Sequence, residues 1–368
     1  MNPRHIAIFI RYLPMGGVQK IAVRLANEFV KRGHTVDLVL AKGKGALADE
    51  VHPEVKMVDL NKNRVWLALP ALGKYLLRRR PQALLSLGFS ANVLSSVLNV
   101  LIPHDFGVFI SVRSNTSRLA KNDKMWYSRW VPSITRVFYP LADKIIAVSE
   151  GVLEDLSSIS PRAGRRGCVI YNPVFNSEVL RKAEEPVSHP WFEEKDVPII
   201  LGVGRLTPQK NFDLLLRAFK RVRREKEARL IVLGDGNQRE NLEARIEALD
   251  LGGRVDLHGF VDNPYPFMRR ASLLVLSSDY EGLPSVPIQA LACGCPVVTT
   301  DCPSGPREIL DDGTWGRLVP VGDEEALAEA ITESLNETHD PEYLRQRAMD
   351  FSVDKAVDNY LDTLFPEA

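Results

Sequence analysis

Residues 276–300 read LSSDYEGLPSVPIQALACGCPVVTT, a pattern typical of a buried strand, a glycine-bearing loop, a short helix and a second buried strand. The loop and the first helical turn span Gly282 to Val286, with the helix beginning near Pro284. Backbone N–H groups there can point at a phosphate, helped by the helix dipole. Glu281 precedes the loop and Gln289 lies on the helix, so a carboxylate and an amide are expected to line one pocket.

The segment EGLPSVPIQA (281–290) resembles the EGF-x-x-x-x-E-A segment of the retaining family-four glycosyltransferases, with Gln289 in place of the family's second glutamate. Five further segments resemble this family in the expected order: PMGGVQK (14–20), VGRLTPQKN (203–211), LGDG (233–236), HGFVDN (258–263) and DCPSGPREIL (301–310). The resemblance of the first of these segments is weak. The resemblance implies an α/β protein of GT-B fold, in which two doubly wound Rossmann-like domains face a central cleft.

Length and composition fit a globular protein of about two domains, since the chain has 368 residues. No apolar run reaches the ~18 residues of a spanning helix, and the N-terminus lacks the pattern of a secretory signal. The expected location is therefore cytoplasmic. The four cysteines show no metal or redox spacing and are expected to be reduced core thiols.

Net charge is zero, but it is unevenly distributed. Residues 1–182 contain 27 Lys and Arg against 13 Asp and Glu, a net charge of +14, and the remainder carries −14. A basic first domain suggests an anionic partner. The alternative is charge complementarity between the two domains.

The chain in order alternates apolar runs with helical patterns, which predicts two doubly wound domains. The first shows strands near 5–10, 36–40, 83–87, 107–112, 144–148 and 168–170. A proline-rich stretch follows, and the second domain begins with the strand PIILGVG (198–204). The expected division is an N-terminal acceptor-binding domain, a linker, a C-terminal donor-binding domain and terminal helices, at residues 1–180, 181–197, 198–340 and 341–368. By resemblance, the last helix crosses back onto the first domain.

The segment between the strands near 107–112 and 144–148 mixes cations with aromatic rings: Arg118, Lys121, Lys124, Trp126, Tyr127 and Trp130. This composition suits a membrane interface or single-stranded nucleic acid. A core-packed helix is the alternative, because Tyr127, Trp130 and Ile134 keep a helical period. We expect the helix to pack and its N-terminal loop to face an anionic membrane surface, with no nucleic-acid partner.

Four residues are the candidate catalytic groups. Arg205 and Lys210 follow a strand end, and two cations at this spacing can hold a diphosphate and neutralise a leaving group. By resemblance, Glu281 binds the donor sugar. Arg113 follows another strand end in the first domain, where it is expected to meet the acceptor or the leaving phosphate.

The remaining candidates bind the donor through backbone groups or short polar side chains: Gly16, Gly17, Gly234, Asp235, Gly259, Phe260, Val261, Gly282, Leu283, Ser285, Val286 and Gln289. Plain turns are the alternative for the glycines. No D-x-D pair occurs, and the histidines are not clustered in the sequence, so neither a metal nor another cofactor is expected.

These patterns predict a retaining, metal-independent glycosyltransferase that moves a sugar from a UDP-sugar to a lipid-linked or polysaccharide acceptor in cell-surface glycan biosynthesis. It is expected on the inner face of the cytoplasmic membrane. Two alternatives remain open: a UDP-sugar epimerase of the same fold, and a nucleotide-sugar-binding protein without catalysis.

Overall fold

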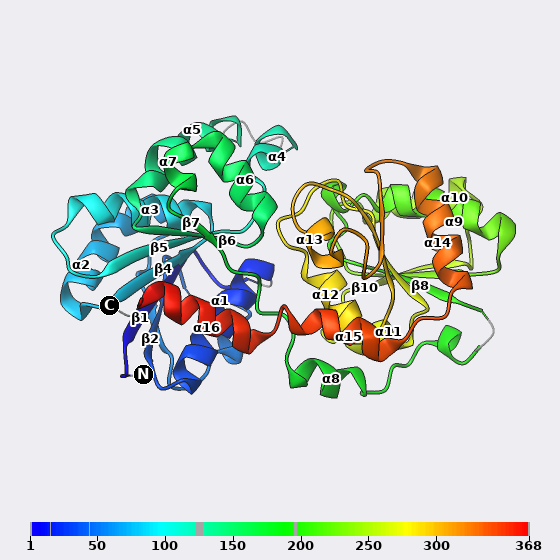
Figure 1. Cartoon of the computed structure of the whole chain (residues 1–368), viewed down its shortest axis with the longest axis horizontal. Helices are drawn as coiled ribbons and strands as arrows, with labels where there is room; N and C mark the ends of the chain where they lie inside the picture. Colours follow the sequence, from blue (N-terminus) through cyan, green and yellow to red (C-terminus); the bar gives the residue numbers. More distant parts are fainter. Residues whose placement is uncertain (1, 15, 44, 123–127, 195–196, 367–368) are drawn as a thin grey trace. The chain divides into compact units, whose positions relative to one another are not determined.

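The computed structural model describes residues 2–14, 16–43, 45–122, 128–194 and 197–366. The chain divides into two compact units, described separately here: unit 1 (1–173 and 354–368) and unit 2 (174–353) (Figure 1).

Unit 1 is built on a seven-stranded parallel sheet in the order β3-β2-β1-β4-β5-β6-β7. Its strands are β1 (His5–Ile10), β2 (Thr35–Leu40), β3 (Lys56–Asp59), β4 (Ala83–Leu87), β5 (Gly107–Val112), β6 (Lys144–Ala147) and β7 (Gly167–Val169). The strands predicted from apolar runs are present. The edge strand β3 was missed, because its half-exposed sequence KMVD lacks such a run.

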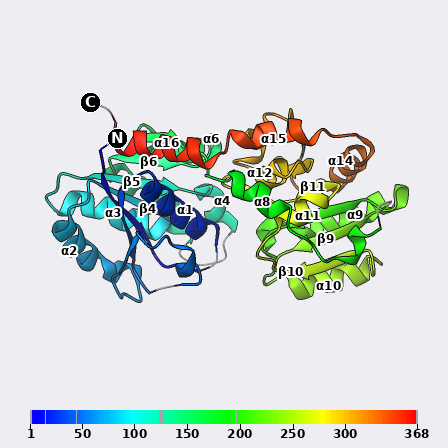
Figure 2. The ribbon, with the colours of Figure 1, turned by 90° about the horizontal axis from the view of Figure 1, so that it is seen from below.

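Helices cover both faces of this sheet (Figure 2). They are α1 (Gly17–Lys31), α2 (Leu69–Arg79), α3 (Phe89–Leu101), α4 (Thr116–Asn122), α5 (Val131–Phe138), α6 (Glu150–Ile159), α7 (Pro161–Gly164) and α16 (Val353–Leu364), with 3₁₀ turns that include η2 (Val65–Ala68) and η3 (Ser128–Trp130). Alternate residues of a strand point to opposite faces, so Ala7 and Phe9 pack under α2 and α3. The last helix, α16, packs on α1 through Tyr360, whose ring lies 6.5 Å from that of Phe29.

Unit 2 repeats the architecture with a six-stranded parallel sheet in the order β10-β9-β8-β11-β12-β13. Its strands are β8 (Ile199–Val203), β9 (Arg229–Leu233), β10 (Val255–Gly259), β11 (Leu273–Leu276), β12 (Val297–Thr300) and β13 (Arg317–Val319). Its helices are α8 (Ser177–Ala183), α9 (Phe212–Glu225), α10 (Arg239–Ala248), α11 (Tyr265–Arg270), α12 (Ser285–Ala292), α13 (Pro306–Leu310), α14 (Glu324–Asn336) and α15 (Pro341–Met349).

Unit 2 begins at Val174, so α8 and the stretch after it belong to unit 2 rather than to a first domain and a linker. Polar contacts explain the difference. Asn263 Nδ2 donates to the Lys182 carbonyl and to the Glu185 carboxylate, and these contacts bind the end of α8 to the loop before α11.

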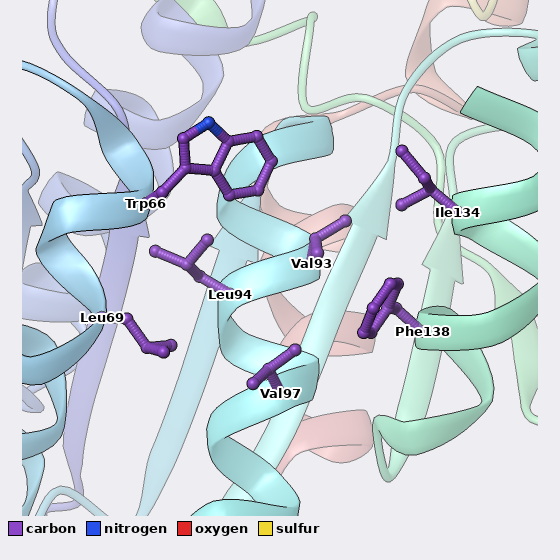
Figure 3. Close-up of a pocket in the computed structure, with 7 residues that line it drawn as sticks. All are labelled: Trp66, Leu69, Val93, Leu94, Val97, Ile134 and Phe138. Atoms are coloured by element: carbon purple, nitrogen blue, oxygen red, sulfur yellow. The ribbon is translucent and has the colours of Figure 1, made fainter. Parts of the chain in front are cut away.

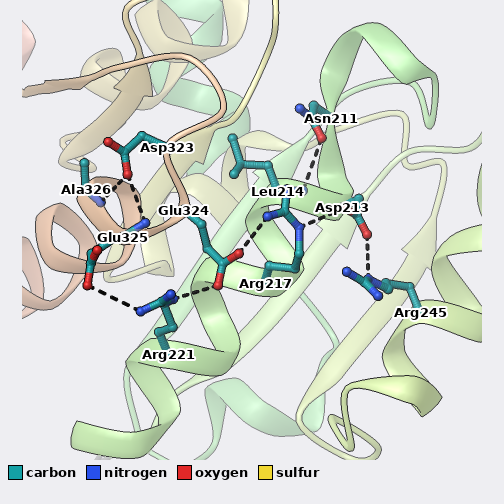
Figure 4. Close-up of polar contacts among 10 residues, drawn as sticks. All are labelled: Asn211, Asp213, Leu214, Arg217, Arg221, Arg245, Asp323, Glu324, Glu325 and Ala326. Atoms are coloured by element: carbon teal, nitrogen blue, oxygen red, sulfur yellow. Dashed lines mark hydrogen bonds and ion pairs between the residues drawn. The ribbon is translucent and has the colours of Figure 1, made fainter.

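An ion-pair network joins α9 to α14 on one face of this sheet (Figure 4). Glu324 accepts from Arg217 at 2.6 Å and from Arg221 at 2.7 Å, and the Arg221 contact lowers the pKa of Glu324. Asn211 caps the start of α9 through its Oδ1 and directly follows Lys210. The network therefore helps to fix the helix that leaves the candidate site.

All four cysteines are unpaired, and three are buried. Burial raises the pKa of Cys293 to about 12. These thiols are therefore protonated near neutral pH and pack as small apolar side chains.

Candidate donor-binding site

The candidate site lies where the strand order of unit 2 reverses. β8 is flanked by β9 on one side and β11 on the other. The loops that follow β8 and β11 therefore leave the sheet side by side, although they are far apart in the sequence. In open α/β sheets, ligands bind at the carboxyl ends of the strands, at this reversal point. The loop after β8 carries Arg205 and Lys210, and the loop after β11 carries Glu281.

Lys210 and Glu281 form an ion pair at the centre of the site. Lys210 Nζ lies 2.5 Å from Glu281 Oε1, and both side chains are largely buried. Ser278 Oγ donates to the same oxygen at 2.7 Å. Within the described ranges, Glu281 Oε2 has no protein hydrogen-bond partner, so this oxygen remains able to accept from a ligand hydroxyl.

A ladder of hydrogen bonds holds the two loops together. The Asp279 N–H donates to the Gln209 carbonyl, Gln209 Nε2 donates to the Tyr280 carbonyl, and Asn211 Nδ2 donates to Asp279 Oδ1. Ser277 Oγ donates to the Lys210 carbonyl at 3.0 Å. Sequence reasoning missed these supporting residues, although they flank the predicted pair directly, because their contacts join segments remote in sequence.

Gly204 and Gly234 permit a close approach of backbone at the strand ends. A Cβ on Gly204 would lie 3.3 Å from Lys210 Cε, so the lysine stem crosses the glycine. Gly234 has φ of +137°, and a Cβ there would lie 1.9 Å from the Gly204 carbonyl oxygen. This packing is a structural reason for Gly234, and its donor-binding role stays a prediction.

Arg205 differs from Lys210 in its surroundings. Its side chain is exposed, and no hydrogen bond or ion pair of its guanidinium is found among the described residues. An exposed guanidinium on the same loop as the partly buried Lys210 is suited to binding a mobile anionic group that arrives from solvent.

The helix α12 adds backbone donors. No side chain caps its first turn, which leaves the N–H groups of Ser285 and Val286 directed out of the N-terminal end. Gln289 lies just over one turn into the helix, and its Nε2 donates to the Tyr265 hydroxyl at 3.3 Å. Gly282 and Leu283 are buried, so their predicted contribution would come from backbone groups.

The remaining donor candidates of unit 2 follow the other strand ends. Asp235 Oδ1 accepts from the Gly236 N–H at 2.7 Å, and this bond lowers the pKa of Asp235. Gly259 ends β10 with φ of +96°, and Phe260 beside it is exposed. Val261 follows it and is half-buried. An exposed ring at this edge is available to stack on a base.

In unit 1 the predicted residues lie on separate elements. Gly16 is the residue before α1 and Gly17 begins that helix, with open space where a Gly17 Cβ would lie. Arg113 follows β5 and donates to Asn172 Oδ1 and, at 3.3 Å, to Ser111 Oγ; burial lowers the pKa of Arg113. These contacts connect two strand ends of unit 1, and the acceptor role of Arg113 stays a prediction.

Two histidines meet in space, contrary to the sequence interpretation. His189 Nε2 and His258 Nδ1 lie 3.1 and 3.0 Å from the same Asp256 oxygen, a spacing that could hold a metal ion. The Trp191 N–H, however, donates to His189 Nδ1, which leaves the ring proton on Nε2, facing Asp256. This hydrogen bonding favours a structural role in joining the stretch after α8 to β10.

The predicted membrane segment is only partly described. Lys124, Trp126 and Tyr127 lie outside the described residues, as does the side chain of Lys121. Arg118 and Trp130 are exposed. No helix in the described ranges has the length and apolar character needed to cross a membrane.

Two family models match the chain, one on each half. The family described as Glycosyl transferases group 1 matches residues 184–351, and Glycosyltransferase Family 4 matches residues 15–176. Both sheets also have the Rossmann-like strand order of the GT-B fold. Together the two glycosyltransferase models match most of the chain, which has the two-domain GT-B fold.

Relatives of known name agree with this assignment. A Campylobacter jejuni N-acetylgalactosamine-N,N'-diacetylbacillosaminyl-diphospho-undecaprenol 4-alpha-N-acetylgalactosaminyltransferase is 37% identical over 204 residues, which cover 55% of this chain and 53% of the relative. The match therefore spans about half of that relative's length. A second match, to an uncharacterised Methanocaldococcus jannaschii glycosyltransferase, covers 46% of that relative. The Rhizobium meliloti lipopolysaccharide core biosynthesis glycosyltransferase LpsE is 27% identical, covering 95% of this chain and 96% of its own.

Solved structures share the fold. Anabaena HepE, in complex with UDP and glucose, superimposes with a TM-score of 0.78 at 18% identity, covering 98% of this chain and 99% of its own. The lipopolysaccharide outer core galactosyltransferase WaaB gives a TM-score of 0.76 at 20% identity, with coverage of 98% and 99%.

Proposed function

We propose that the protein transfers a sugar from a UDP-sugar to a lipid-linked saccharide acceptor, with retention of the anomeric configuration and without a metal ion. The observation that carries the proposal is the buried Lys210–Glu281 pair at the sheet reversal point, beside the exposed Arg205. The named relatives support the choice of substrates: one acts on a diphospho-undecaprenol saccharide, and HepE was solved with UDP and glucose.

In this proposal, Arg205 and Lys210 bind the donor diphosphate and stabilise its growing negative charge as it leaves. The Ser285 and Val286 N–H groups add dipoles of the same sign. Glu281 Oε2 accepts a hydrogen bond from a sugar hydroxyl, and Gln289 binds the ribose hydroxyls.

The chemical step breaks the bond between the sugar C1 and the diphosphate oxygen and forms a bond between C1 and the acceptor oxygen on the same face. The departing diphosphate takes the proton of the acceptor hydroxyl. No protein nucleophile is required, and the two cations of this site supply the charge that a metal would otherwise supply.

The test begins with a thermal-shift panel of UDP-, GDP-, ADP- and TDP-sugars, since a ligand that binds only the folded state raises Tm. UDP-sugars should give the largest shift. Transfer to a lipid-linked acceptor is then followed in excess EDTA, and the product anomer is determined by NMR. Complete loss of transfer in EDTA, restored by Mg²⁺ or Mn²⁺, contradicts the metal-free mechanism, and an inverted product contradicts retention.

The two alternatives give different results with UDP-sugar alone. An epimerase converts the donor without an acceptor, and a binding protein without catalysis releases no UDP. A Glu281→Gln variant serves as the control in these assays with UDP-sugar, because it keeps the shape of the site and removes the carboxylate.

A peripheral position at the inner face of the cytoplasmic membrane completes the proposal, since a lipid-linked acceptor would be met there. Its support from the sequence is the positive charge of the first half of the chain.

A further inference from the structure

Unit 1 has an apolar groove. Except for Arg113, the predicted site residues lie far in the sequence from the residues that line it. Its volume is about 240 Å³, and it is lined by Trp66, Leu69, Val93, Leu94, Val97, Ile134 and Phe138. The lining comes from three elements. Figure 3 shows α3 as the floor, with η2 and the start of α2 on one side and α5 on the other.

Helical spacing produces the groove. Val93 and Val97 lie four residues apart on α3, and Ile134 and Phe138 lie four residues apart on α5, so each pair occupies one face of its helix. These faces line a groove that is open to solvent. All the lining side chains are hydrocarbon except for the indole N–H of Trp66.

Large apolar side chains are also exposed on the elements that frame the groove. Trp66 is 54% exposed on η2, Val137 is 60% exposed on α5, and Leu101 is 65% exposed at the end of α3. Trp130, which precedes α5, is exposed too. Exposed apolar side chains gathered on neighbouring elements mark a binding surface more often than chance.

The positive charge of unit 1 comes from the stretch of chain that contains these elements. Residues 60–142 contain twelve Lys and Arg but only two acids, Asp105 and Asp123, whereas the rest of unit 1 contains 14 of each sign. The net charge of unit 1, +10, therefore equals that of residues 60–142, in which Lys74, Arg78 and Arg79 lie on α2 and Arg136 lies on α5. Arg64 precedes η2, and Arg129 lies 5.8 Å from the Trp130 ring centre.

We propose that this groove is a membrane-docking site: the surface binds an anionic phospholipid bilayer, and one lipid hydrocarbon chain enters between η2, α3 and α5. An apolar groove without acceptors suits a hydrocarbon chain, the flanking cations Arg64 and Arg129 suit anionic headgroups, and tryptophans are enriched at the membrane interface. The residues that line the groove, and the cations Arg64 and Arg129 next to its framing elements, all lie among the described residues.

The inference rests on the proposed function in one respect: a lipid-linked acceptor is the reason why membrane binding would be useful. The vesicle experiment tests the inference separately from sugar transfer, because vesicle binding needs neither donor nor acceptor.

Co-sedimentation tests it with vesicles of phosphatidylcholine alone or mixed with phosphatidylglycerol. The wild-type protein should bind the mixed vesicles at low salt, be released at high salt, and bind pure phosphatidylcholine weakly. Trp66→Ser with Val137→Ser should weaken binding about tenfold or more, as should Arg64→Ser with Arg129→Ser, since each cation near an anionic surface contributes about fivefold. All four side chains are exposed, so these variants should fold.

Matched controls come from unit 2. Met349→Ser removes an equally exposed apolar side chain, and Arg224→Ser removes an exposed cation; both should bind vesicles as the wild type does. All variants should keep the Tm shift with UDP-sugar, which separates this inference from the proposed function.

A separate measurement tests whether a lipid hydrocarbon chain enters the groove. Phosphatidylglycerol with brominated acyl chains should quench tryptophan fluorescence on binding, and Trp66→Phe should remove a large part of the quenching. Equal binding to neutral and anionic vesicles, wild-type binding by the Trp66→Ser, Val137→Ser variant, or quenching unaltered by Trp66→Phe overturns the proposal. So does a concentration-dependent dimer that this double variant abolishes in the absence of vesicle binding, because a second copy would then cover the groove.

Discussion

Lys210 Nζ lies 2.5 Å from Glu281 Oε1, although 70 residues separate the two in the chain. Both side chains are largely buried, and the same carboxylate oxygen also accepts from Ser278. Burying two charges costs free energy that their attraction offsets only in good geometry. The cost of this burial fits the proposed role of the pair as a prearranged donor site.

The buried pair predicts strong coupling in stability. Lys210→Met and Glu281→Gln should each lower the free energy of unfolding, with Lys210→Met costing about 3–5 kcal/mol because it leaves a buried carboxylate without its cation. The double variant should cost clearly less than the sum. Urea unfolding measures all four proteins. Additive losses would show that the two side chains do not interact in solution.

Arg205 should matter for the donor and not for folding. Its guanidinium is exposed, so Arg205→Ala should leave Tm nearly unchanged while lowering turnover by roughly two to three decades, the range for loss of one prearranged charge-stabilising group. Arg224→Ala, at an exposed position on α9, is the control and should behave as the wild type. Near-normal transfer by Arg205→Ala would place the donor diphosphate elsewhere.

Gln289 can be replaced by glutamate, the residue found at this position in the family that the sequence resembles. Gln289→Glu introduces a carboxylate, which makes charge-assisted hydrogen bonds to ribose hydroxyls. We expect a lower KM for UDP-sugar by up to about tenfold, and a higher KM for Gln289→Ala. Steady-state kinetics with a UDP-sugar series measures both. A rise in KM for the glutamate variant would mean that the amide donates to the ligand.

Gly234 should not tolerate a side chain. A Cβ would lie 1.9 Å from the Gly204 carbonyl oxygen, and φ is +137°, so Gly234→Ala should destabilise the protein by roughly 2–5 kcal/mol. Gly252→Ala is the matched control, since nothing lies within 4 Å of its Cβ position. Thermal unfolding compares the two variants, and equal Tm values would contradict the close packing of these loops.

Asp37 should make unit 1 sensitive to acid. This fully buried carboxylate accepts from Tyr75 at 2.6 Å and Arg79 at 3.0 Å and lies 3.2 Å from His5. Burial opposes its ionisation, but the contacts with His5, Arg79 and Tyr75 prevail and hold the pKa of Asp37 below its usual range. Its contribution to stability is therefore complete above the unfolded pKa of about 4 and is lost as pH falls further.

Asp37→Asn should cost about 3–5 kcal/mol at pH 7. The difference from the wild type should shrink as pH falls below about 4, because Asp37 then takes up a proton in the unfolded chain while it stays ionised in the folded protein, and this proton uptake favours unfolding. Urea unfolding at several pH values measures this, with the exposed Asp49→Asn as control. A difference that is constant with pH would show that Asp37 titrates alike in the folded and unfolded chains.

The sequence alone determined where most strands lie and which candidate residues follow their carboxyl ends. A strand buried on both faces of a parallel sheet is a continuous apolar run, and the residues just after it lie at the ligand-binding edge. Arg205 and Lys210 were proposed as site residues for this reason, and Glu281 from the family resemblance. The edge strand β3 lacks such a run, since only one neighbour covers it.

Only the tertiary structure decided which loops meet. The pairing of β8 with β11 brings Lys210 to Glu281, the contact of α3 with η2 and α5 forms the apolar groove, and the stretch after α8 brings His189 to His258. Each of these meetings depends on long-range packing. Local patterns of apolar and polar residues fix the elements of a chain, whereas the free energy of burying their faces together fixes which of them are neighbours.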